Sequence, residues 1–86
     1  MILKDALKLR SLIISSNNLM ENALSFLETT KDDSNAYRLG MEMFETPLSS
    51  YKTFIKKASE EGIKFPEEEF TFDRIKNKYD QITGRE

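Results

Sequence analysis

The feature that most constrains this chain is a long row of apolar residues in helical phase near its middle. The row keeps an uninterrupted spacing of four and three residues, which places its members on one helix face: Tyr37, Met41, Phe44, Leu48, Tyr51, Ile55 and Ala58. Most of the stability of such a helix comes from packing its apolar face against a partner. The spacing therefore predicts a helical protein in which a second helix covers this row.

The row passes straight through Thr46 and Pro47. A proline inside a helix removes one backbone hydrogen bond and clashes with the preceding turn, at a cost of ~3 kcal/mol. Thr46 is a favourable N-cap residue, and Pro47 would be tolerated at the first position of a new helix. We therefore expect a break or a sharp kink at Thr46, with both halves presenting the same face to one partner.

Glycines mark two further features of this segment. Gly62 is expected to end the helix in the left-handed conformation, with Ile63 folding back onto the last turn near Ala58. Gly40 lies inside the first half, where it either weakens the helix or lets another part of the chain approach closely.

A second helical stretch runs from Ile2 to Glu28, which contains neither glycine nor proline. Three seven-residue series make its stripe wider than a coiled-coil seam: Leu9, Ser16 and Ala23; Leu12, Leu19 and Phe26; and Ile13, Met20 and Leu27. Further apolar positions widen it more, at Leu3, Leu7 and Ile14. We expect one continuous helix, because the apolar phase does not slip. The alternative is a turn at Ser15–Asn18, in which Asn18 caps a second helix and Glu21 completes the capping box.

The two long segments predict an antiparallel hairpin. Thr29 to Ser34 is polar and has the composition of a connection, in which Asp33 or Ser34 can begin the next helix. On either side, Ile2–Glu28 and Asn35–Glu61 have 27 residues each, or ~40 Å of helix. Equal arms joined by a short loop are typical of an antiparallel pair. We expect Phe44, Leu48, Tyr51 and Ile55 to pack against Leu12, Ile13, Leu19 and Met20.

A shorter third helix is predicted near the C-terminus. Glu67, Glu68 and Glu69 suit a first helical turn that begins at Pro66. The helical row itself covers about Phe72 to Thr83, with Gly84 as the stop and with apolar side chains at Phe72, Ile75, Tyr79 and Ile82. The sequence as a whole thus predicts a single all-α domain over residues 1–86, a long helical hairpin with a shorter C-terminal helix.

Composition argues against catalysis. The chain has no histidine, cysteine or tryptophan, and its three glycines stand alone. It therefore lacks thiol and imidazole nucleophile–base pairs, Cys/His metal sites and a Gly-rich phosphate loop. Asp32 and Asp33 lack the spacing of a calcium loop and are interpreted as a loop and helix cap. We expect no enzyme, no cofactor and no metal.

Bulk charge argues against a nucleic-acid partner without excluding one. The net charge is -2 at pH 7, whereas nucleic-acid binders usually carry a basic surplus. An alternative function, a small DNA-binding transcriptional or replication regulator, would use the cations of the third helix: Arg74, Lys76, Lys78 and Arg85. The charged N-terminus does not resemble a signal peptide, so the expected location is the cytoplasm.

The leading hypothesis is a non-enzymatic helical protein that binds or occludes a partner protein. Its basis is the first helix, which is apolar on several sides and uncharged from Ser11 to Met20. Candidate interface residues on this helix are Leu7, Ser11, Ile14, Ser15 and Asn18. A homodimer is slightly favoured over a monomer. Lysine outnumbers arginine nine to four, a bias that fits a phage or mobile element of a low-GC bacterium.

Overall fold

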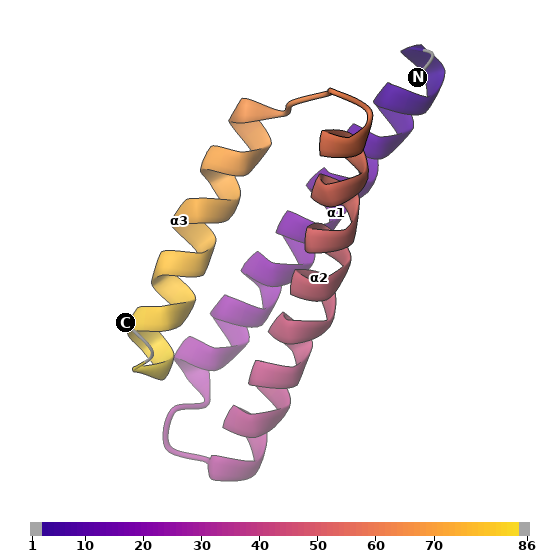
Figure 1. Cartoon of the computed structure of the whole chain (residues 1–86). Coiled ribbons are helices and arrows are strands. Elements are labelled where there is room, and N and C mark those ends of the chain that lie inside the picture. The colour runs from indigo at the N-terminus through magenta and orange to yellow at the C-terminus, as the bar shows by residue number, and fades with distance from the viewer. Residues whose placement is uncertain (1–2, 85–86) are drawn as a thin grey trace.

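The computed structural model describes residues 3–84, which form three α-helices (Figure 1). Helix α1 spans Leu3–Thr29, α2 spans Ser34–Glu60 and α3 spans Pro66–Thr83. The chain reverses direction at each connection, so α1 and α3 run one way and α2 runs the other (Figure 1). The molecule is elongated, measuring 47 × 20 × 16 Å. The predicted fold class is confirmed: α1 and α2 pack as a long hairpin, and the shorter α3 contacts α1.

Helix α1 is continuous through Ser15–Asn18, so the alternative of a turn at that point is wrong. Its predicted first residue, Ile2, lies outside the described residues. The connection to α2 is short, and Asp33 caps the new helix: its side chain accepts hydrogen bonds of 3.1 Å from the backbone N–H groups of Asn35 and Ala36. A local polar signal in the sequence was sufficient to place this boundary.

Helix α2 also runs without interruption through Pro47, so the predicted break there is wrong. Thr46 is an interior residue rather than an N-cap, and its hydroxyl donates a 3.2 Å hydrogen bond to the carbonyl of Glu42, one turn earlier. Pro47 is buried. Both halves of α2 belong to one helix that packs against α1, and this packing outweighs the local cost of the proline. Of the two predicted possibilities, a break or a kink, only a kink within one continuous helix is compatible with the bounds of α2.

The three glycines serve two purposes. A Cβ on Gly40 would lie 2.7 Å from Cδ2 of Leu27 and 2.9 Å from Cδ1 of Phe26. The missing side chain therefore lets α1 approach α2 closely near the hairpin loop. Gly62 and Gly84 have φ of 71° and 72° and end α2 and α3 as predicted. The N–H of Ile63 folds back to the carbonyl of Ala58 at 2.8 Å, which satisfies the last turn of α2.

Helix α3 has 18 residues and begins at Pro66, earlier than the predicted helical row at Phe72. Pro66 occupies the first turn, where its missing N–H costs nothing. The carboxylate of Glu69 reaches back to accept a 3.3 Å hydrogen bond from the N–H of Phe65. The predicted first turn of Glu67, Glu68 and Glu69 is thus part of α3 itself, and the helix is ~27 Å long.

The core lies where α1 faces both α2 and α3. Side chains from all three helices are fully buried there: Ile13, Met20, Leu27, Phe44, Ile75 and Tyr79. Aromatic rings join α2 to α3 in two stacked pairs, Phe44 on Tyr79 at 3.8 Å and Tyr51 on Phe72 at 4.0 Å between ring centroids. The hydroxyl of Tyr37 adds a 3.2 Å hydrogen bond to the carbonyl of Ile82. Long side chains therefore connect α2 to α3.

The predicted packing is confirmed for Ile13, Met20, Phe44 and Tyr51, which are buried. Leu48 and Ile55 are partly buried against the core. The prediction is wrong for Leu12 and Leu19, which are 41% and 56% exposed. The reason is the position of α3, which packs against the opposite flank of α1 and turns the Leu12–Leu19 flank toward solvent.

The orientation of α1 about its own axis buries Ile13 and exposes Leu12, so it predicts unequal losses of stability when each is replaced by alanine. Ile13→Ala should lower the free energy of unfolding by ~2–5 kcal/mol, because it opens a cavity in a closed core. Leu12→Ala should cost less than ~1 kcal/mol, because that side chain is already half in water. Urea titration of both variants measures the difference. Equal losses would show that α1 is rotated from the arrangement described.

Pro47 offers a second test. Because α2 is continuous, Pro47→Ala restores a backbone donor and removes a clash, and should stabilise the protein by about 1–3 kcal/mol. Thr46→Ala should change stability by less than ~0.5 kcal/mol, since Thr46 caps nothing. Thermal and urea unfolding report both values. A stability loss of about 1 kcal/mol in Thr46→Ala would instead indicate a helix start at this point.

Burial of Tyr51 predicts a loss of stability in alkali. Burial, reinforced by the nearby carboxylates of Glu69, Asp73 and Glu68, raises the pKa of the Tyr51 phenol well above its ordinary value. In the unfolded chain the Tyr51 phenol ionises near pH ~10. In the folded protein the phenol stays protonated at that pH. The contribution of Tyr51 to stability is therefore complete below this pH and declines as pH rises above it.

The matched variant is Tyr51→Phe, which keeps the aromatic ring stacked on Phe72 and removes the ionisable hydroxyl group. Its unfolding free energy, measured in urea from pH 8 to pH ~11.5, should fall less steeply than that of the natural chain. Every other ionisable group is the same in the two proteins, so the difference in slope isolates Tyr51. Identical slopes would contradict the prediction.

Candidate protein-interaction surface

The side of α1 that α2 and α3 leave uncovered is exposed and carries no charged residue over three turns. We call this surface the outer face of α1 and define it by the exposed residues from Ser11 to Asn22: Ser11, Leu12, Ile14, Ser15, Asn18, Leu19 and Asn22. An outward helix side normally carries charged residues. This face instead combines small polar side chains with large apolar ones.

All five residues predicted as interface candidates are exposed. Four of them follow a spacing of four and three along one side of α1: Leu7, Ser11, Ile14 and Asn18. Ser15 lies one turn after Ser11 on the same side. The structure therefore brings the predicted set together on one continuous surface.

Two apolar members of the outer face were missed as surface residues by sequence reasoning. Leu12 and Leu19 were assigned to the core, yet they flank the polar centre of the face on one side. Leu7 and Ile14, which are 56% and 37% exposed, flank it on the other. The available signal was spacing: Leu12 lies three residues before Ser15 and Leu19 lies four residues after it, so both are neighbours of Ser15 on the helix surface.

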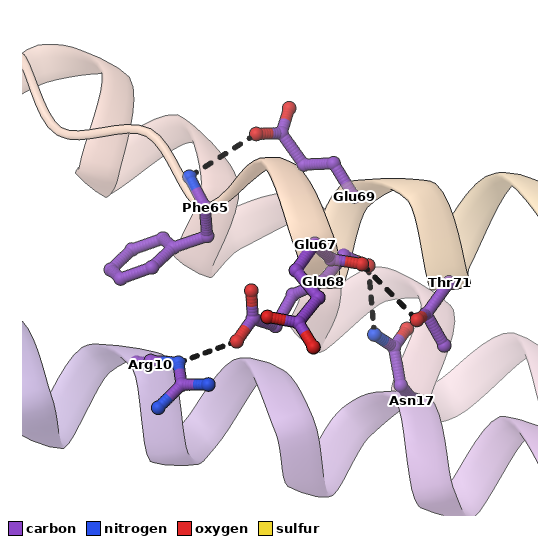
Figure 2. Close-up of polar contacts among 7 residues, drawn as sticks. All are labelled: Arg10, Asn17, Phe65, Glu67, Glu68, Glu69 and Thr71. Atoms are coloured by element: carbon purple, nitrogen blue, oxygen red, sulfur yellow. Dashed lines mark hydrogen bonds and ion pairs between the residues drawn. The ribbon is translucent and has the colours of Figure 1, made fainter.

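A polar junction beside this face holds α3 on α1 (Figure 2). The side-chain amide of Asn17 donates a buried 3.1 Å hydrogen bond to the backbone carbonyl of Glu68. The guanidinium of Arg10 pairs with the carboxylate of the same residue, and Glu68 is only 7% exposed. A partly exposed Arg10 keeps this nearly buried carboxylate compensated. Sequence reasoning missed the junction, because nothing local distinguishes Glu68 from the two glutamates beside it.

The cations proposed for nucleic-acid binding are engaged with carboxylates. Arg74 pairs with Glu21 at 3.1 Å and Lys78 with Glu28 at 2.8 Å, both across the α1–α3 contact. Lys76 pairs with Asp80 at 2.6 Å within α3. The hydrogen bond from Lys78 lowers the pKa of the Glu28 carboxyl from its usual value. Arg85 lies outside the described residues.

Other kinds of site find no support in the described part of the chain. Within residues 3–84, no cluster of three or more acidic, histidine or cysteine side chains is placed to hold a metal ion. None of the helices there is long and apolar enough to span a membrane.

Comparison with known proteins adds no relative from which a role could be carried over. No protein-family model matches this chain, and neither a curated protein nor a solved structure matches it significantly. Its function has to be argued from the surface itself.

Proposed function

We propose that this chain is a non-enzymatic interaction protein that binds, and thereby occludes, a partner protein through the outer face of α1. The observation that carries the proposal is the combination of exposed leucines with a run free of charge. Leu12 and Leu19 are 41% and 56% exposed, within a segment that has no charged residue from Ser11 to Met20. Exposed apolar side chains with depleted charge are typical of interface centres.

The fold supports binding because it holds this face rigid. The opposite side of α1 is anchored in the core by Ile13, Met20 and Leu27, which are fully buried. A preformed helix face loses little conformational entropy when a partner covers it, so more of the contact energy contributes to affinity. Catalysis is disfavoured for a chemical reason, since the sequence lacks both histidine and cysteine.

The DNA-binding alternative is less favoured. Phosphate contacts require cations that are free to replace counterions. Arg74, Lys76 and Lys78 would first have to give up their carboxylate partners. The net charge of -2 adds a repulsive background.

Affinity capture followed by mass spectrometry, using lysate of the source cell, tests the proposal. Leu19→Glu places a charge in the middle of the outer face without touching the core, and should abolish capture of the partner. Gln81→Glu introduces the same charge at an exposed position on α3. It is the matched control and should capture the same protein as the natural chain. Circular dichroism confirms that both variants are folded.

Equal capture by Leu19→Glu would show that the outer face is not the binding surface. Fluorescence anisotropy with duplex DNA at two salt concentrations tests the alternative. Micromolar binding that weakens steeply with salt would favour the DNA-binding function instead.

A further inference from the structure

We propose that the outer face of α1 binds a second copy of this chain, with the two α1 helices antiparallel. This inference rests on the proposed function, since it names the occupant of the same face. The centre of the face is a row with spacing four, three and four: Ser11, Ser15, Asn18 and Asn22. Its spacing matches that of the contact positions in a two-helix coiled coil, with small polar residues here in place of apolar ones. All four residues are exposed.

The side chains of this row are chemically able to pair with the same row of a second chain. In a symmetric pair each group meets an equivalent or neighbouring group of the same face, so any charge near the two-fold axis would meet its like. The outer face carries none. Asparagine amides and serine hydroxyls both donate and accept hydrogen bonds, so identical rows can satisfy each other. A strongly charged partner would find no complementary charge here.

Charge at the N-terminal end of the row selects the antiparallel direction. Lys4 and Lys8 continue the same spacing toward the start of α1. In a parallel pair each of these lysines would face its own copy, which is repulsive. In an antiparallel pair centred between Ser15 and Asn18, Lys8 instead lies opposite the uncharged Ser25, and Ser11 lies opposite Asn22.

The antiparallel register also covers exposed apolar surface. Leu12 of one copy comes beside Leu19 of the other on one flank, and the contact from Lys8 to Ser25 extends over ~26 Å. Helices α2 and α3 leave the row itself uncovered, because Ser11, Ser15, Asn18 and Asn22 are exposed in the folded chain. Helix α3 borders the row, with Thr71 lining a groove beside Asn18 and Arg74 lining one beside Asn22. The small central residues allow the two helices to approach closely.

Cysteine cross-linking tests the pairing and its direction, since the natural chain has no cysteine. Lys8→Cys and Ser25→Cys alter exposed positions. An antiparallel pair predicts a disulfide when the two variants are mixed and oxidised, and little when each is oxidised alone. Disulfide formation in each variant alone would indicate a parallel pair and overturn the proposal. Gln81→Cys on α3 controls for collisional cross-linking.

Sedimentation equilibrium tests the association itself. The natural chain should sediment at twice its 10.0 kDa mass. Ser15→Glu brings two like charges close to the axis and should weaken the dimer by more than about tenfold, with the helical circular dichroism unchanged, whereas Gln81→Glu should not. A 10.0 kDa species from low micromolar to submillimolar concentration would overturn the proposal, as would a dimer that Ser15→Glu leaves intact.

The two proposals fail in distinguishable ways. Suppose that the natural chain stays monomeric but captures a different protein, and that Leu19→Glu abolishes this capture. This result overturns the second copy as the occupant of the face and retains the proposed function. If Leu19→Glu still captures the partner and Ser15→Glu still dimerises, both proposals are overturned.

Discussion

The rotational setting of α1 is the constraint on which the rest of the structure depends. Ile13, Met20 and Leu27 point into the angle between α2 and α3 and are fully buried. Once these residues are inside, helical geometry places Ser11, Ser15 and Asn18 on the opposite side. The core and the proposed interface are therefore two consequences of one orientation, and a rotation of α1 would change both.

Helix α3 sets this orientation through two different kinds of contact. It lies against α1 through polar groups, with Asn17 bonded to the backbone of Glu68 and Arg10 paired with its carboxylate (Figure 2). It reaches α2 through stacked rings, Phe44 on Tyr79 and Tyr51 on Phe72. The rings contribute apolar burial, whereas the buried amide and carboxylate fix the register, because a shifted helix would leave them unpaired.

The same contacts explain why the cations of α3 do not form a basic patch. Arg74 and Lys78 are directed to carboxylates of α1, whereas the outer face of α1 is exposed and carries no charge. Such a face binds by exclusion of water and by shape rather than by electrostatic steering. This character is the basis for our proposals that the face binds a protein and that this protein is a second copy of the chain.

The sequence by itself determined the features that depend on neighbouring residues. The helical arms, their connection, the Asp33 cap and the glycine stops at Gly62 and Gly84 were predictable because each rests on short-range hydrogen bonds and periodicity. Only the tertiary structure decided that Pro47 stays inside one helix, that Leu12 and Leu19 are exposed, and that Glu68 is buried. The continuity of α2 depends on its packing along α1, whereas the other two outcomes depend on which flank of α1 receives α3. Both reflect the summed packing of residues distant in sequence.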